Sequence, residues 1–126
     1  MAKQILVVVS NPIPGQEDEY NRWYSEQHLD DVLRVPGMIA AQRFKLALDG
    51  AKSLPGPYLA IYEMETDDPA PDPKQTFEAL AKVASSGQMP ISPALDTVNM
   101  VASVFRPITE RKVSAGAAVG AKTARK

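Results

Sequence analysis

The stretch EYNRWYSEQHLDDVLRVPGM, residues 19–38, decides the fold of this chain. It gathers two tyrosines, the only tryptophan and the only histidine of the sequence into a short acidic run. Three acidic residues at positions 17–19 suit the first turn of a helix, where the helix dipole favours carboxylates, and the Pro-Gly pair at 36–37 is a typical helix stop. The stretch therefore predicts one helix over residues 16–35.

The segments on either side of this helix predict a four-stranded sheet and a second helix. Runs of apolar and β-branched residues predict strands over residues 3–10, 38–48, 58–66 and 98–106. The sequence DPKQ at 72–75 is typical of a helix start and predicts a helix over residues 73–86. The order β-α-β-β-α-β is typical of an α+β, ferredoxin-like fold, in which both helices cover one face of an antiparallel sheet.

The strands are apolar on both faces, although helices can cover only one. Residues 5–9, ILVVV, lack the apolar-polar alternation of a sheet with one solvated face. Because large exposed apolar patches are rare on monomers, something must cover the second face. We expect a homodimer in which the two sheets pack against each other.

Composition limits the class of protein and its partners. The 126 residues suit one domain, which we assign to residues 1–109, followed by a basic, flexible C-terminal tail over residues 110–126. The first segment carries nine basic and fourteen acidic side chains, so an acidic body disfavours nucleic acid as a partner. No apolar run is long enough to span a membrane, and the absence of cysteine agrees with a reducing compartment. We expect a cytoplasmic protein with no membrane partner.

One face of the first helix is both aromatic and polar. At 100° per residue, Tyr20, Tyr24, His28, Asp31 and Val32 share this face. Because only this face aligns the large aromatic side chains, we assign it to the sheet side. A wall of mixed polarity beside a sheet is typical of a small-molecule pocket.

Three of these side chains form a candidate acid-base set. Asp31 lies three residues after His28, at a spacing that allows the carboxylate to orient the imidazole and raise its pKa. Tyr24, four residues before His28, is placed to donate a hydrogen bond to a developing oxyanion. We assign catalysis to His28 as base, Asp31 and Tyr24, while a packing role for a lone histidine stays open.

Four further side chains are candidates for substrate binding. Tyr20 and Trp23 share the aromatic helix, and Arg43 and Tyr62 lie on the second and third predicted strands. Each has an ordinary alternative: a core position for the aromatic residues and a solvent-facing charge for the arginine. The sequence contains no dinucleotide-binding or phosphate-binding glycine motif and no metal-ligand spacing, so we expect neither a metal nor a cofactor.

The sequence resembles a known superfamily over residues 8–46. The residues that carry the resemblance are Asn11-Pro12, Gly15, Glu17, the stretch 19–38 and Arg43-Phe44. They are similar to the dimeric α/β-barrel superfamily, and most similar to its EthD-like branch. The resemblance implies a dimer with packed sheets, a pocket between helices and sheet, and a functional histidine at His28. Haem-degrading members carry their histidine on the second helix, where residues 73–87 have none.

The superfamily spans cyclases, isomerases, dehydratases, cofactor-free monooxygenases and haem-binding proteins. The leading prediction is a cofactor-independent lyase, isomerase or cyclase that uses His28 for proton transfer on a small aromatic, polyketide-like or lactone substrate. Two alternatives stay open: a non-enzymatic dimer that binds a ligand or has a structural role, and a cofactor-free monooxygenase of the same fold.

Overall fold

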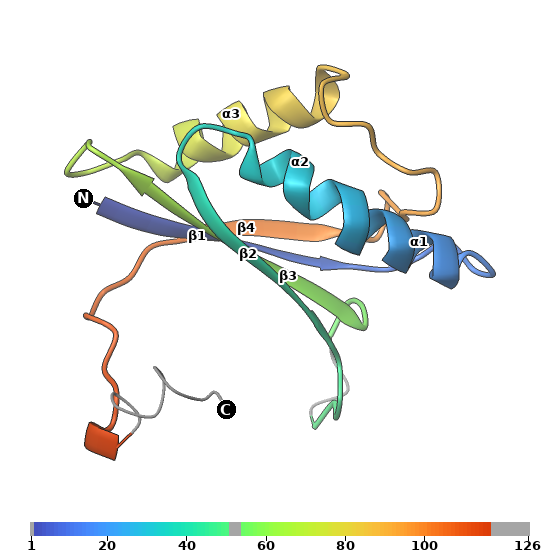
Figure 1. Ribbon diagram of the computed structural model, residues 1–126, viewed down its shortest axis with the longest axis horizontal. Helices are drawn as coiled ribbons and strands as arrows, with labels where there is room; N and C mark the ends of the chain where they lie inside the picture. Colours follow the sequence, from blue (N-terminus) through green and yellow to red (C-terminus); the bar gives the residue numbers. More distant parts are fainter. Residues whose placement is uncertain (1, 51–53, 117–126) are drawn as a thin grey trace.

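The computed structural model describes residues 2–50 and 54–116. Its elements are β1 (Ala2–Ser10), α1 (Glu17–Trp23), the π-helical turn η1 (Tyr24–His28), α2 (Leu29–Leu33), β2 (Met38–Lys45), β3 (Tyr58–Thr66), α3 (Pro73–Ser85) and β4 (Val101–Phe105). The four strands form one antiparallel sheet in the order β2-β3-β1-β4. Helices α1, α2 and α3 lie on one side of this sheet (Figure 1). The predicted α+β, ferredoxin-like fold is therefore confirmed.

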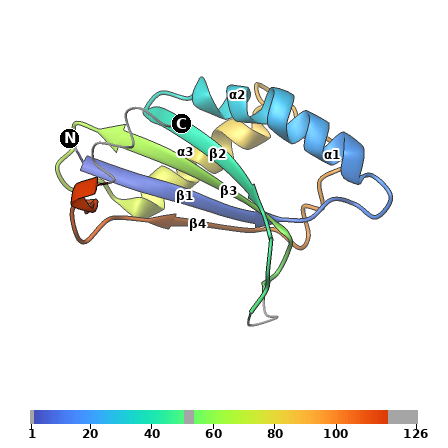
Figure 2. The same ribbon diagram turned by 60° about the horizontal axis from the view of Figure 1, so that its bottom comes forward.

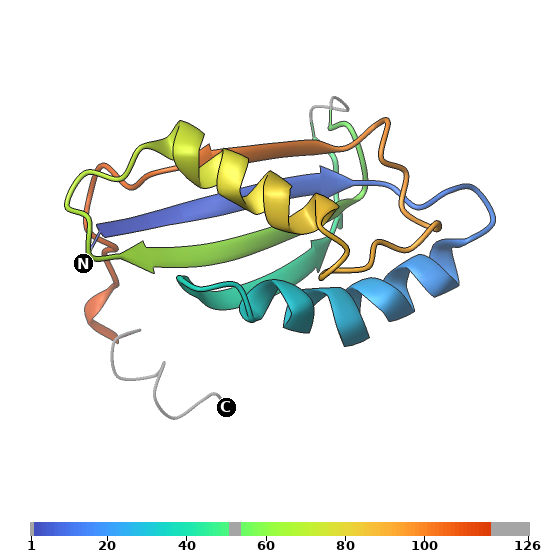
Figure 3. The same cartoon turned by 90° about the horizontal axis from the view of Figure 1, so that it is seen from above.

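The helical layer consists of two roughly parallel rods. One is the continuous run α1-η1-α2 and the other is α3, and seen from above they lie side by side over the strands (Figure 3). Asp72 caps α3 as its sequence predicts, because its carboxylate accepts a hydrogen bond from the Lys74 backbone at 3.0 Å. The first rod ends at Leu33, and Gly37 in the turn before β2 has a φ of 95°, a conformation that glycine adopts without strain.

Two strands are shorter than their sequences predict. The fourth strand begins at Val101 instead of residue 98, because the Asp96 carboxylate accepts hydrogen bonds from the backbone of Val98 and Asn99 and holds them in a turn. The second strand ends at Lys45 instead of residue 48. Residues 46–48 continue the apolar pattern of this strand, but they are exposed beyond its paired part.

The prediction of one regular α-helix over residues 16–35 is wrong in its middle. The backbone N–H of Leu29 bonds to the carbonyl of Tyr24, five residues earlier, which is the pattern of a π-helical turn. The turn lies between α1 and α2 and leaves the rod continuous. Single π turns occur frequently at functional sites.

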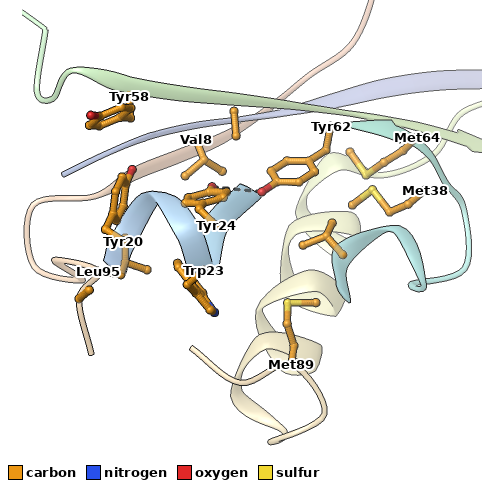
Figure 4. Close-up of a cluster of buried hydrophobic side chains, with 13 residues drawn as sticks. Val8, Tyr20, Trp23, Tyr24, Met38, Tyr58, Tyr62, Met64, Met89 and Leu95 are labelled. Carbon is orange, nitrogen blue, oxygen red and sulfur yellow. Dashed lines mark hydrogen bonds between the residues drawn. The ribbon is translucent and has the colours of Figure 1, made fainter. Parts of the chain in front are cut away.

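The core lies between the helical layer and the sheet. Its buried apolar residues are Val8, Tyr20, Trp23, Tyr24, Val32, Met38, Tyr58, Ala60, Tyr62, Met64, Met89, Ala94 and Leu95. The close-up shows the aromatic side chains of the first rod packed beneath β3 (Figure 4). The aromatic face of the first helix therefore faces the sheet, as expected.

The opposite face of the sheet carries a continuous apolar row. Cross-strand pairing places Val101, Val9, Leu59 and Phe44 side by side on β4, β1, β3 and β2. Val101 and Phe44 are 46% and 41% exposed. In the turned view, α1, α2 and α3 all lie on the far side of the sheet from this row (Figure 2). The expectation of an uncovered apolar face is therefore met.

Beyond β4, the described residues 106–116 are exposed. Residues 117–126 of the predicted tail lie outside the described part of the chain. Within residues 2–50 and 54–116, every helix is too short or too polar to cross a lipid bilayer.

Candidate functional site

A cavity of about 370 Å³ lies between α3, the π turn and the sheet. Its walls are formed by Leu6, Val8, Tyr24, His28, Tyr62, Phe77, Leu80, Ala81, Ala84, Ser85, Met89, Ile91, Leu95, Thr97, Met100 and Ala102. We call this space the His28 cavity. Its lining is mainly aliphatic and aromatic and includes no lysine or arginine. Such an apolar space suits a small apolar ligand, and its few polar groups can orient that ligand.

The π turn determines what surrounds His28. On a regular α-helix, residues five apart point about 140° away from each other. Here the rings of Trp23 and His28 stack with centroids 4.6 Å apart, because the wider turn brings them to one side. The edge of Tyr24 closes a second side of the imidazole at 5.0 Å. His28 is therefore held by two aromatic rings at the wall of the cavity.

Burial keeps the imidazole neutral. Desolvation is the main reason why the pKa of His28 falls to about 4; Asp31 opposes this shift and the charge of Arg43 adds to it. The Asp31 carboxylate thus acts in the direction expected from the sequence, but burial outweighs it. The Nδ1 atom is covered and has no hydrogen-bond partner among the described residues. At neutral pH the ring can accept a proton or a hydrogen bond.

Two tyrosine hydroxyls form the polar part of the same wall. The Tyr62 hydroxyl donates a hydrogen bond to the Tyr24 oxygen at 3.1 Å (Figure 4). Tyr24 therefore keeps its own hydroxyl hydrogen for another acceptor. Burial raises the pKa of Tyr24 to about 12 and that of Tyr62 above its ordinary value, so both phenols stay protonated. Both predicted residues line the cavity beside His28.

Asp31 is not placed as the sequence predicts. It is buried and forms an ion pair with Arg34, three residues along the helix. No hydrogen bond joins it to His28 within the part of the chain that the structure describes. It lines a separate, smaller cavity. Its assignment as the orienter of the imidazole is therefore corrected, because Arg34 takes one carboxylate oxygen and the π turn surrounds His28 with rings.

Tyr20 and Trp23 do not line the His28 cavity but pack against residues that do. Tyr20 is fully buried and shares a 2.6 Å hydrogen bond with the Ser10 hydroxyl. The Trp23 indole N–H donates to the carbonyl of Pro90 at 3.2 Å, which ties the loop after α3 to the first rod. The core alternative thus describes both residues better than direct substrate binding.

Arg43 also lies outside the cavity lining. Its guanidinium donates hydrogen bonds to Ser25 at 2.7 Å and Asn21 at 2.9 Å. It lies 4.4 Å from the centre of the Tyr24 ring. This contact is a cation–π interaction that braces the outer side of Tyr24. Arg43 is therefore held against the first rod and is not a free surface charge.

Sequence reasoning missed several apolar walls of the cavity. The α3 residues Phe77, Leu80 and Ala84 follow the apolar helical spacing, which identifies a buried face but not a cavity. Met89 and Ile91, in the loop that follows α3, also line the cavity. The described residues contain no group of three or more histidine, aspartate or glutamate side chains arranged to hold a metal ion.

Comparisons with known proteins give structural neighbours only. No protein-family model matches the sequence, and no curated protein resembles it at a significant level. A candidate monooxygenase from Shewanella loihica PV-4 aligns with a TM-score of 0.54 at 17% identity, over 86% of this chain and 96% of its own. These likenesses show the fold.

Two further neighbours concern one haem-degrading protein. MhuD from Mycobacterium tuberculosis, with two haems bound in its active site, aligns with a TM-score of 0.54 at 15% identity over 86% of this chain and 99% of its own. A point variant of MhuD with two manganese protoporphyrin IX molecules per active site gives 0.54 at 14% identity, over 87% and 99%.

Proposed function

We propose that this protein is a monooxygenase-type enzyme that oxidises a small, apolar, electron-rich aromatic substrate without a bound cofactor. The observation that carries the proposal is the His28 cavity, a mainly apolar space with a neutral imidazole and a tyrosine hydroxyl pair on its wall. The fold shared with a candidate monooxygenase supports the same class of reaction.

This proposal replaces the leading prediction from the sequence. A lyase, isomerase or cyclase is contradicted by the solved neighbours, which are described as a monooxygenase and a haem degrader. The EthD-like branch stays a prediction, since the neighbours support the fold and not that branch.

The proposed chemistry begins with removal of a proton by His28. Loss of a proton from a phenol or an anthrone-type methylene gives an electron-rich anion that can transfer an electron to O₂. The low pKa of His28 describes the cavity without a substrate, and an anion beside the ring favours the imidazolium form. The free hydroxyl hydrogen of Tyr24 stabilises the oxyanion. In the overall reaction CH₂ and O₂ become C=O and H₂O.

The residues present do not fit a haem. The lining of the His28 cavity offers no lysine or arginine to pair with the two propionates. An axial histidine usually donates its second ring nitrogen to an acceptor, but Nδ1 of His28 has none among the described residues. His28 is also the only histidine of the chain, and α3 has none.

We further propose that the working unit is a homodimer. The row Val101, Val9, Leu59 and Phe44 lies on the sheet face that no helix covers. Phe105, which is 54% exposed, pairs with Ile5 and extends this apolar surface. A second copy packing sheet against sheet would remove it from water.

Oxygen uptake tests the proposed reaction. The purified protein, without added metal or flavin, is mixed with a panel of anthrones and phenols in an oxygen electrode, and a parallel sample is titrated with hemin. We expect uptake with at least one anthrone and no sharp haem absorbance band. A tight band with hemin would favour a haem protein, and ligand binding without uptake would favour a binding protein.

A further inference from the structure

A second cavity of about 470 Å³ lies on the other flank of α3. It is bounded by the start of β1, the end of β3, the turn between α2 and β2 and one face of α3. On α3, Thr76, Ala79 and Val83 line this second cavity, whereas Phe77 and Ala84 line the His28 cavity. The two spaces therefore flank one helix.

Leu80 is the one described residue that lines both cavities. At 100° per residue, its side chain lies between the directions of Val83 and Ala84, which face the two different spaces. Leu80 is partly buried and packs against the core beneath α3. Its side chain therefore forms the partition between the cavities.

The second cavity is more polar than the first, and one of its polar groups is a hydrogen-bond donor without a partner among the described residues. Gln4 lines it and is only 3% exposed. Its side-chain carbonyl accepts a hydrogen bond from the Thr76 hydroxyl at 2.8 Å, but its Nε2 donor has no partner among the described residues. A buried unpaired donor favours a ligand with an acceptor.

The charged residues around the second cavity limit which kinds of acceptor group can bind there. The lining includes the acidic residues Glu65, Asp68 and Asp72 and no lysine or arginine. A carboxylate or phosphate group on a ligand would meet like charges there, whereas an ether, ketone or amide oxygen would not. The second cavity is therefore suited to a neutral, hydrogen-bond-accepting group.

We propose that Leu80 sets the length of the ligand by separating the His28 cavity from the second cavity, which a neutral, acceptor-bearing tail can enter only when this side chain is shortened. The inference rests on the proposed function, since the aromatic part of the ligand must occupy the His28 cavity. With Leu80 in place, the site takes compact ring systems. When this side chain is shortened, a tail passes beneath α3 toward Gln4.

Fluorescence anisotropy with three anthracene probes tests the inference. One probe has no tail, one has a methoxyhexyl tail and one has a carboxypentyl tail. For the wild type, we expect the bare probe to bind and neither tail to improve its Kd. For Leu80→Ala, we expect the methoxyhexyl probe to bind about tenfold more tightly than the bare one, since several methylenes become buried. The carboxypentyl probe should gain little.

Matched variants distinguish the loss of the Leu80 partition from a simple gain in cavity volume. Phe77→Ala enlarges the His28 cavity from the other flank and should not create a preference for the tail. Leu80→Ala/Val83→Phe refills the second cavity and should abolish it. Gln4→Leu in the Leu80→Ala background should remove the advantage of the methoxyhexyl probe over a fourth probe that has a plain hexyl tail. Leu80→Val, which removes less volume, should show a weaker preference if Leu80→Ala does not fold.

The outcomes distinguish this inference from the proposed function. If the bare probe binds but both Leu80 variants lack a tail preference, or if Phe77→Ala shows the same preference, Leu80 is not the partition. If the bare probe does not bind the wild type, the proposed use of the His28 cavity fails, and the inference that depends on it fails too.

Discussion

The indole of Trp23 stacks on the imidazole of His28, five residues along the chain, with the ring centroids 4.6 Å apart. A regular α-helix would direct these side chains to different faces. The π turn over Tyr24–His28 makes the contact possible and places a neutral imidazole at the wall of an apolar cavity. The local backbone irregularity and the candidate site are therefore one feature.

The first prediction concerns the titration of His28. Its pKa is about 4 because burial disfavours the charged ring, so the imidazole should stay neutral from pH 5 upward. NMR of the single imidazole should give a midpoint near 4. The Trp23 fluorescence should change over the same range in the wild type and not in His28→Gln. A midpoint at or above 6.5 would contradict the described burial.

The same shift predicts how stability depends on pH. The pKa of His28 is lower in the folded protein than the ordinary value of 6.5, so the unfolded chain binds more protons between these values. The contribution of this residue to stability should be complete above pH 6.5 and should be lost as the pH falls toward 4. Melting temperatures across this range should fall less steeply for His28→Gln. Parallel curves would show that His28 does not contribute.

The second prediction compares the effect on kcat of losing the tyrosine hydrogen bond in the cavity with the effect of losing another buried hydroxyl. Tyr62→Phe removes the donor to Tyr24 and should cost about 1 kcal/mol of folding free energy. It should also lower kcat roughly tenfold, because the Tyr24 hydroxyl loses its orientation. Tyr20→Phe is the matched control, since it loses a hydrogen bond with Ser10 outside the cavity. Equal effects of both variants on kcat would refute a special role for the pair.

Much of the fold follows from local sequence signals. The Asp72-Pro73 start of α3, the Pro36-Gly37 stop and the β-branched strands act through their own backbone preferences. The uncovered apolar sheet face also follows from sequence, because the apolar run in β1 lacks polar-apolar alternation and therefore makes both faces of the strand apolar.

The details of the candidate site do not follow from such signals. A π turn differs from an α-turn by one hydrogen-bond register, and no residue type between Tyr24 and His28 marks it. Spacing allowed Asp31 to meet either His28 or Arg34, and the tertiary structure selected Arg34. Arg43 reaches the Tyr24 ring from strand β2, a contact that a helical wheel of the first helix does not represent.

The third prediction concerns Arg43 as a brace and not a ligand contact. Arg43→Met removes the hydrogen bonds to Ser25 and Asn21 and the contact with the Tyr24 ring, so stability should fall by about 1–2 kcal/mol. The Kd of an apolar anthracene probe should stay within about twofold of the wild type, because Arg43 does not line the cavity.

Arg22→Met is the control for this prediction. Arg22 forms an exposed ion pair with Glu19, and its loss should leave the stability nearly unchanged because solvent screens the pair. A large loss of probe affinity in Arg43→Met at unchanged stability would restore Arg43 to the binding site.

The fourth prediction concerns the homodimer. Ile61 lies in the middle of the uncovered sheet face, paired with Val7 on β1. Ile61→Lys should convert the dimer to monomer in sedimentation velocity, because an unpaired charge cannot be buried between two apolar sheets. Glu78→Lys, on the exposed side of α3, adds a lysine elsewhere and should leave the dimer intact. A wild-type protein that sediments as a monomer at high concentration would contradict this part of the account.

The central claim is that His28 helps to place one atom of O₂ into an apolar aromatic substrate. Mass spectrometry of the product formed under ¹⁸O₂ tests it most directly, with an anthrone that supports oxygen uptake. The account predicts one labelled oxygen atom per product molecule, no requirement for added cofactor, and product formation at least about 100-fold slower with His28→Ala. Unlabelled product, or equal rates for wild type and variant, would contradict it.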